Sequence, residues 1–486
     1  MLFNSLQFAL FFIALTGLHF SLPHRFRWVV MLAASYYFYM CWSVGYILLL
    51  FISSLITWYS GLKIAQAKDR QKRKFFLIVS LSLNLGALLF FKYFNFFISS
   101  IFEISAKFNL LSAIDAPLLK IMLPVGISFY TFQTVSYIID VHKGKIEPEA
   151  HFGIFSLYVA FWPRIVAGPI ERAGRLIPQF KQVVSFDYKR ATDGFRLILW
   201  GMIKKVVIAD YLAIYVNQVF DNCQDYTGVP VITASIFFTV QIYCDFSGYS
   251  DMAIGTAKVM GYELTENFNR PYFSSSLREF WQRWHISLST WFRDYVYIPL
   301  GGNRVIKLRF YYNLLITFLV SGLWHGANWT FVIWGGLHGI YLVVENIFEE
   351  IWGRISKNST IGFKNLENLR LSTYFRVAIT LFLVNYAWIF FRANTVSDAF
   401  EITKRLFIFG GKNPDSPVIA PSAFVLSLFF IVSLFAIEFK EQKIKIEHYV
   451  ASLPITVRWS IYTLGLWAVI ISTIFGVKQE FIYFQF

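Results

Sequence analysis

Long apolar runs separated by short polar stretches dominate the chain. Twelve of them approach or exceed the roughly 20 residues that a helix needs to cross a bilayer. They cover residues 2–20, 28–43, 44–62, 75–101, 118–140, 193–217, 231–260, 310–324, 327–347, 373–391, 422–438 and 457–475. We therefore predict an all-α, polytopic integral membrane protein with about 11–12 transmembrane helices, in a single domain over 1–486. A further apolar segment, 152–168, is broken by Pro163, Gly168 and Pro169 and predicts a re-entrant or interfacial piece.

Composition agrees with a surface that faces lipid. Hydrophobic residues make up 56% of the chain and charged residues 15%, whereas a soluble domain is about 25% charged. This excludes a soluble enzyme, a disordered protein and a nucleic-acid binder. The three cysteines, Cys41, Cys223 and Cys244, have no disulfide or metal spacing. The first apolar run has no basic stretch before it and no Ala-x-Ala-like site before Pro23, which predicts a retained helix.

Loop charges predict the orientation. The net charge is +15, and basic residues gather in 63–74, 270–309 and 439–447, which the positive-inside rule assigns to the cytoplasm. The 218–230 loop carries two Asp and no Lys or Arg, so we predict that it lies outside, with both termini. The 392–421 loop also falls outside by parity, against the rule, since it holds Arg392, Lys404, Arg405 and Lys412.

The segment 274–294 is a candidate wall of a functional site. Ser276 and Glu279 have capping-box spacing, which predicts that a helix starts there. One apolar stripe then consists of Trp281, Trp284, Leu288 and Trp291, and His285 lies beside Trp284. The spacing of these residues alone favours an aromatic belt at the membrane interface with a solvated histidine.

The basic turn that follows, 297–304, contains Pro299, Gly301 and Gly302. Its positive charge suits an anionic donor such as coenzyme A or a phosphopantetheine arm. On composition alone, ordinary cytoplasmic charge that only sets topology is clearly the favoured explanation of the same residues.

His325 is the most informative residue, because it lies between two apolar runs in the sequence SGLWHGANW. An ionisable group at membrane depth is a functional hypothesis by default. Gly322 and Gly326 have the spacing that lets helices approach closely. Low hydration favours neutral imidazole, which can take a proton from a hydroxyl that attacks an acyl carbon. A structural histidine bonded to a neighbouring helix is the alternative, and it is favoured for His338.

Two carboxylates, Asp245 and Asp251, lie within the apolar run 231–260. They can orient an imidazole, line a polar tunnel, or pair with a basic side chain such as Lys258 or Arg283. Buried polar contacts between helices explain them equally well. The chain has no G-x-S-x-G, Walker or HExxH motif and no Cys in a reactive-site context, so a covalent serine or cysteine mechanism has no support from sequence.

Together these motifs resemble the membrane-bound O-acyltransferase (MBOAT) family, in particular its bacterial alginate O-acetylation branch. The resemblance is carried by WQRWHISLSTWFRDYVYIPLGGNR (281–304), QIYCDFSGYSDMAIG (241–255), PVGISFYTFQTVSYIIDV (124–141), FWPRIVAGPI (161–170), SGLWHG (321–326) and the ending EFIYFQF. Arg164 departs from the pattern, which has a neutral residue there. The motif-bearing catalytic core is 118–345.

The resemblance implies a function and a set of site residues. The family's marker histidines fall on His285 and His325, the latter as catalytic base. The candidates for lining a tunnel or binding the donor are Trp281, Arg283, Trp284, Arg293, Asp294, Asn303, Asp245, Asp251 and Trp324.

The resemblance also implies a donor, an acceptor and a location. The expected reaction moves acetyl from acetyl-coenzyme A or another thioester toward an extracytoplasmic polysaccharide, alginate or another cell-envelope glycan. The expected location is the cell inner membrane, with no bound cofactor, no metal and no nucleic acid. Partner proteins outside the membrane are expected to complete the transfer, and whether this chain or a partner acylates the sugar stays open.

Three alternatives remain. Teichoic-acid D-alanyl transferases share an RWH-containing stretch with this chain. A secondary transporter or flippase also fits about a dozen spans with buried Asp245 and Asp251, but it explains neither histidine, and the chain has no inverted repeat. A scaffold that only assembles a secretion complex would tolerate loss of His325.

Overall fold

Helices account for every regular element in the residues that this computed structural model describes, which are 1–108, 117–119, 122–358, 370–410, 413–414, 417–441, 444–476 and 479–482. The chain divides into two compact units. The first comprises Met1–Ile198 with Met252–Thr265, and the second Leu199–Asp251 with Glu266–Phe486. The prediction of one domain over 1–486 stays a prediction.

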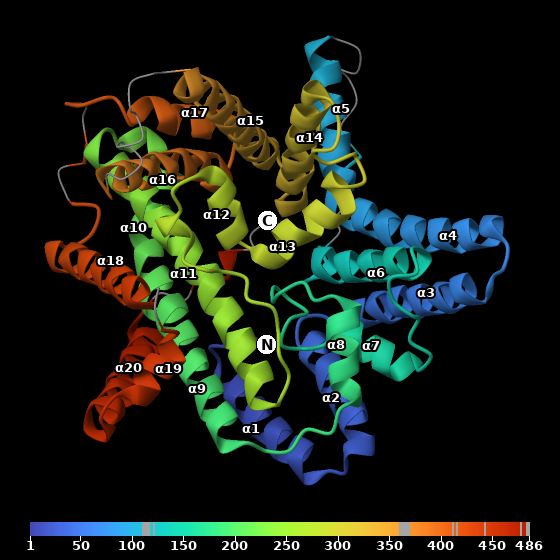
Figure 1. The fold of residues 1–486 in the computed structure, drawn as a ribbon. Helices are drawn as coiled ribbons and strands as arrows, with labels where there is room; N and C mark the ends of the chain where they lie inside the picture. The colour runs from blue at the N-terminus through green and yellow to red at the C-terminus, as the bar shows by residue number, and fades with distance from the viewer. Residues whose placement is uncertain are drawn as a thin grey trace. The chain divides into compact units, whose positions relative to one another are not determined.

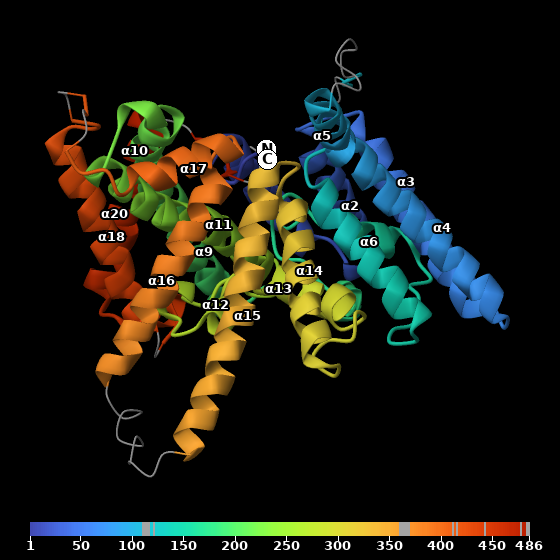
Figure 2. The same ribbon diagram turned by 90° about the horizontal axis from the view of Figure 1, so that it is seen from above.

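Three helices of the first unit are joined by a buried asparagine. The elements of this unit are α1 (Leu6–Ser21), α2 (His24–Met40), α3 (Tyr46–Gln66), α4 (Arg70–Leu88), the π-helical η1 (Leu89–Tyr93), α5 (Phe94–Lys107), α6 (Ile127–His142), α7 (Phe152–Ala160), α8 (Ala173–Lys181) and most of α9 (Tyr188–Met202). Helices α3, α4 and α6 lie side by side (Figure 1 and Figure 2). Asn84 on α4 donates to Thr57 on α3 (3.0 Å) and accepts from Thr134 on α6 (3.1 Å). Such buried polar contacts hold helices together where no water competes.

The second unit carries most of the sequence motifs. Its elements are the end of α9, the π-helical η2 (Ile203–Ala209), α10 (Asp210–Asp221), η3 (Cys223–Asp225), most of α11 (Val229–Val259), η4 (Pro271–Phe273), α12 (Leu277–Arg283), α13 (Ile286–Phe292), the π-helical η5 (Arg293–Tyr297), α14 (Lys307–His325), α15 (Trp329–Asn358), α16 (Arg370–Arg392), α17 (Val396–Arg405), α18 (Pro421–Glu441), α19 (Ile446–Ser452) and α20 (Ile455–Phe475). Helices α14 and α15 form an antiparallel pair (Figure 2). The core is aromatic, with Trp284, Trp334 and Trp388 almost fully buried.

The helical prediction is confirmed, since a helix lies in each of the 12 predicted runs. Seven helical stretches are long and apolar enough to cross a membrane, namely Tyr46–Gln66, Arg70–Ala106, Val229–Val259, Trp329–Arg354, Thr373–Arg392, Pro421–Glu441 and Ile455–Ile474. In the predicted run 118–140 the helix starts only at Ile127, because Gly126 before it adopts a left-handed φ of 74°; residues 120–121 lie outside the described residues. Segment 152–168 is helical to Ala160 and then turns; its depth in the membrane stays a prediction.

Two arginines of the basic 392–421 loop form ion pairs, while the side of the membrane on which the loop lies stays a prediction. Arg392 donates to Asp221 (2.9 Å) and Asn217 (2.8 Å), and Arg405 donates to Glu401 (2.6 Å). The backbone N–H of Gly228 donates to the carbonyl of Arg405 (2.9 Å). The 218–230 and 392–421 loops therefore meet at the same end of the second unit, as parity requires, and these two arginines are paired with carboxylates. Lys412 lies outside the described residues.

The C-terminal segment packs into the second unit, and its predicted location outside the membrane stays a prediction. Phe481 and Ile482 are buried, Phe481 stacks on Tyr249 with ring centroids 4.7 Å apart, and the N–H of Ile482 donates to Asp245 (2.7 Å). The last residues, 483–486, lie outside the described residues.

Candidate functional site

A close contact between α14 and α15 positions His325, the last residue of α14. A Cβ atom added to Gly322 would lie 2.2 Å from the carbonyl oxygen of Phe331 on α15, and one added to Gly335 would lie 2.2 Å from that of Phe318. The two backbones therefore touch where only glycine fits. The predicted close approach at Gly322 is confirmed, with α15 as the partner, whereas Gly326 lies beyond the helix and packs on the Phe331 ring.

Aromatic rings enclose His325, which is 3% exposed. Its ring centroid lies 5.0 Å from that of Trp324, 4.9 Å from that of Trp334 on α15 and 5.3 Å from that of Phe391 on α16. Trp334 and Phe391 meet the imidazole edge to face. Three helices thus fix the position of this imidazole.

The structure corrects the prediction of one helix through His285. The chain forms α12, ends it at Arg283, and starts α13 at Ile286. His285 in the break has a left-handed backbone, φ 42° and ψ 54°. Hydrogen bonds from the 267–269 segment on both sides of His285 replace the helical ones: Asn269 N–H donates to Arg283 C=O and Ile286 N–H to Asn267 C=O, each at 2.9 Å.

His285 is fully buried, so the reading as interfacial decoration with a solvated histidine is wrong. Its ring lies 4.6 Å from Phe246 and 6.4 Å from His325, centroid to centroid. Trp324 contacts both imidazoles. Burial lowers the pKa of His285 to about 3, so this side chain is neutral near pH 7. The two marker histidines, 40 residues apart in sequence, therefore lie together.

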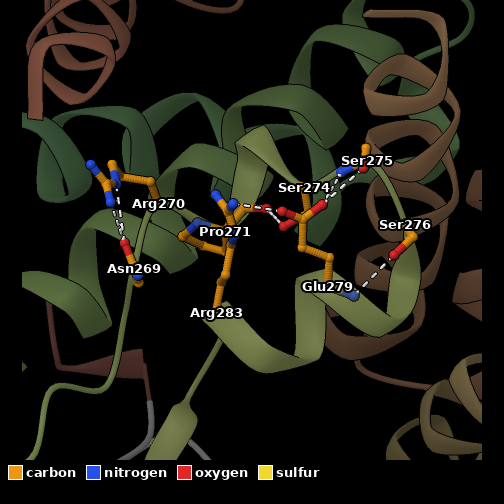
Figure 3. A network of polar contacts seen from close by, with 8 residues as sticks. All are labelled: Asn269, Arg270, Pro271, Ser274, Ser275, Ser276, Glu279 and Arg283. Atoms are coloured by element: carbon orange, nitrogen blue, oxygen red, sulfur yellow. Dashed lines mark hydrogen bonds and ion pairs between the residues drawn. The ribbon is translucent and has the colours of Figure 1, made fainter. Parts of the chain in front are cut away.

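The predicted start of α12 is confirmed. The Ser276 side chain accepts from the N–H of Glu279 (3.1 Å), and Glu279 accepts in turn from the N–H and hydroxyl of Ser275 (Figure 3). The reciprocal bond thus goes one residue earlier than in a standard capping box. Arg283 pairs with Glu279 (2.5 Å) on its own helix.

Asp245 and Asp251 pair with two lysines that the sequence analysis missed. Lys205 on η2 contacts Asp245 (2.6 Å) and Asp210 (2.7 Å), and Lys204 contacts Asp251 (2.5 Å). The suggested partners Lys258 and Arg283 are therefore wrong. The ion pairs and hydrogen bonds of Asp245 and Asp251 in the described residues go to these lysines and to Ile482, and none goes to an imidazole.

The remaining candidates divide into two groups. The first group consists of three buried aromatic side chains, Trp281, Trp284 and Trp324. The Trp281 indole donates to Nδ1 of His338 (3.3 Å). Arg293 and Asn303 are exposed, and Arg293 pairs with its neighbour Asp294 (2.9 Å). The proposed role of Arg293, Asp294 and Asn303 in binding the donor stays a prediction.

Three aromatic residues around the histidines were not predicted as site residues. Trp334, Trp388 and Phe391 pack on one another (Trp334–Trp388 5.5 Å, Trp388–Phe391 5.1 Å), and Trp334 contacts both His325 and His338. Their only signal in the sequence is helical spacing, since Trp388 is three residues before Phe391 and Trp334 four before His338.

Two further features bear on the chemistry. In the part of the chain that the structure describes, no three His, Cys, Asp or Glu side chains are arranged to hold a metal. Arg164, which departs from the family pattern, is fully buried in the first unit, with its guanidinium 5.0 Å from the Tyr158 ring.

Comparisons with known proteins identify the family. The family model of the membrane-bound O-acyltransferases matches residues 150–384. A probable alginate O-acetylase of Pseudomonas aeruginosa is 39% identical over 84% of this chain and 75% of its own length. A peptidoglycan O-acetyltransferase of Helicobacter pylori is 35% identical over 78% and 72%. A teichoic acid D-alanyltransferase of Streptococcus thermophilus is 29% identical over 55% and 68%. This chain, with its apolar helices and enclosed histidines, therefore belongs to the membrane-bound O-acyltransferase family and is an acyltransferase of the membrane.

Proposed function

We propose that the chain transfers an acetyl group from a cytoplasmic thioester toward hydroxyl groups of an extracytoplasmic polysaccharide, across the inner membrane of the cell. The observation that carries the proposal is the buried pair His285 and His325, 6.4 Å apart and enclosed by aromatic rings. Two relatives named as O-acetylating enzymes of alginate and peptidoglycan support acetyl as the group and a glycan as the acceptor.

The chemistry needs one base. The His325 imidazole takes the proton of the attacking hydroxyl while the hydroxyl oxygen bonds to the thioester carbonyl carbon. The tetrahedral intermediate then expels the thiolate, which receives that proton, so the products are an ester and a thiol. A positioned base contributes typically 10²–10⁴-fold, and enclosure of the reactants away from water contributes through proximity. His285, close to His325 and neutral, contacts the same reactants in this proposal.

Acetyl-coenzyme A is the proposed donor, as a substrate rather than a bound cofactor. D-Alanyl transfer is the weaker alternative, because the D-alanyltransferase relative matches only 55% of this chain. The proposed acceptor is either a glycan or a partner protein outside the membrane that passes the acetyl group on.

The test is thioester consumption by purified protein in lipid vesicles with acetyl-coenzyme A and a soluble oligosaccharide. We expect wild type to release free thiol, and His325→Ala to lose at least about 100-fold of that rate. His19→Ala is the matched control, because His19 is equally buried but belongs to the first unit. Thiol release by His325→Ala at the wild-type rate would contradict the role of His325 as the base. No thiol release by wild type, with the oligosaccharide or with a partner protein as the acceptor, would favour a transporter.

A further inference from the structure

The backbone of His285 is unusual among the residues that the structure describes. Among the described residues, Arg270 and His285 are the only ones other than glycine with a positive φ. A non-glycine residue is strained in this region and stays there only where its surroundings impose it. Such strain is typical of functional sites, so the groups that impose it are candidates for tuning the site.

Asn267 is the central residue of the contacts that hold His285 in this left-handed conformation. Its carbonyl accepts from the N–H of Ile286 (2.9 Å), directly after His285. Its side-chain oxygen accepts from the Ser287 hydroxyl (2.6 Å), and its Nδ2 donates to the Ser250 hydroxyl on α11 (3.2 Å). Asn267 is 1% exposed, so these bonds form without competition from water.

Asn267 contacts the two helices next to the His285 imidazole, α13 and α11. Ser287 is two residues after His285 on α13, and Ser250 is one helical turn after Phe246 on α11. Phe246 is the ring that contacts His285 edge to face at 4.6 Å. Asn267 therefore couples the backbone that turns the imidazole to the helix against which the imidazole packs.

We propose that Asn267 is the positioning residue of the acyl-transfer site, which holds His285 in its left-handed conformation and so sets its imidazole beside His325. This inference rests on the proposed function, because it assigns Asn267 a role only through His285. A residue that merely stabilised the fold would lower the amount of folded protein, not the rate of each folded molecule.

The test measures kcat and the KM for acetyl-coenzyme A in vesicles, per folded molecule, for Asn267→Ala, Ser287→Ala, His285→Ala and the double variant Asn267→Ala/His285→Ala. Asn267→Ala removes the side-chain bonds to Ser287 and Ser250 and keeps the backbone bond to Ile286. We expect this variant to lower kcat about 10- to 100-fold, since small misplacement of a reacting group costs this much, with KM changed less than about twofold. Ser287→Ala removes one of the bonds and should lower kcat less. Ser250→Ala keeps the contacts to Ile286 and Ser287 and removes only the link to α11, so it should lower kcat less than Asn267→Ala.

The double variant separates positioning from a structural role. If Asn267 acts through His285, Asn267→Ala lowers kcat no further once His285 is Ala, because residues that act as a unit are not additive. A multiplicative loss, or wild-type kcat in Asn267→Ala, overturns the inference. If Asn267→Ala does not fold, Ser287→Ala decides: a lowered kcat supports the inference and a wild-type kcat overturns it. Wild-type kcat in His285→Ala would instead contradict the proposed role of His285 itself.

Discussion

Two clusters of ionisable side chains are buried in the second unit, and their neighbours differ in kind. Aromatic rings from α14, α15 and α16 surround His325, and Phe246 packs on His285. By contrast, Lys205 lies between the carboxylates of Asp210 and Asp245, and Lys204 lies on Asp251. All three carboxylates belong to α10 or α11, and both lysines to the π-helical η2.

The difference teaches how each cluster is used. Apolar neighbours disfavour charge, and His285 accordingly has a pKa lowered by burial, which suits a base or donor that must be neutral at pH 7. Opposite charges at 2.5–2.7 Å stabilise one another in a medium without water. We therefore assign chemistry to the first cluster and helix cohesion to the second, and the predictions below test that division.

The largest effect is expected on activity at His325. We expect His325→Ala to lower the rate of acyl transfer by about 10²–10⁴-fold and so to lower the O-acetyl content of the exported polymer. His285→Ala should lower both less, because the proposed base remains. Stability should fall by only about 0.5–3 kcal/mol. The measurement is acetyl content in a deletion strain, with protein quantified in the same membranes.

Normal acetyl content at normal abundance would contradict the proposed catalytic role of His325. If the Ala variant does not accumulate, His325→Gln, which keeps more of the volume, provides the same comparison.

Removing Lys205 should affect stability instead. Lys205→Ala leaves the buried carboxylates of Asp210 and Asp245 without their cation, which costs about 3–5 kcal/mol when a buried pair is broken. Thermal unfolding in detergent measures this loss. Lys145→Ala is the control, since that lysine is 56% exposed and its pair with Asp140 (3.7 Å) is worth about 1 kcal/mol at most.

Additional Asp210→Asn and Asp245→Asn changes should restore part of the stability. A Lys205→Ala protein that unfolds at the wild-type temperature yet has no activity would indicate that this ion-pair cluster takes part in catalysis.

Gly322→Ala tests whether the contact between helices positions the histidine cluster. The new Cβ would lie 2.2 Å from a backbone oxygen that has no side-chain freedom to move, so α14 and α15 must separate. We expect a loss of about 1–3 kcal/mol together with reduced acyl transfer. Gly336→Ala on the same hairpin is the matched control, because its Cβ would meet only Leu319 at 3.5 Å. Equal behaviour of the two variants would contradict this account.

Acidification should destabilise the protein through His285. Its pKa is about 3 in the folded chain and about 6.5 when unfolded, so between these values the unfolded state binds more protons. Stability is therefore full above pH 6.5 and is lost as the pH falls toward 3. This group contributes a loss of about 2 kcal/mol between pH 7 and pH 5. Unfolding temperatures of wild type and His285→Gln over this range measure it, and identical pH slopes would refute it.

The smallest effect is expected at Trp281. Trp281→Phe keeps the ring packing but removes the donor to His338, which should cost about 1 kcal/mol and little activity. Trp352→Phe, at a half-exposed position of α15, is the control. A large loss of activity in Trp281→Phe without a loss of stability would indicate that His338 takes part in acyl transfer.

Local patterns predicted most of the fold. Apolar runs mark helices because burial or lipid contact needs one continuous apolar stretch, and each predicted run contains a helix. The Ser276 cap was predictable for the same reason, since donor and acceptor are three residues apart. The motif resemblance predicted the family, which the relatives confirm.

The sequence by itself determined the helices, the family and the two histidines, because these depend on neighbours along the chain. Tertiary structure alone decided that α12 and α13 separate at His285, since the hydrogen bonds responsible come from residues 267 and 269. It alone paired Asp245 with Lys205, which precedes it by 40 residues. Periodicity reports which face of a helix is apolar, but it carries no information on which distant backbone or charge will meet that face, and that choice belongs to the packed fold.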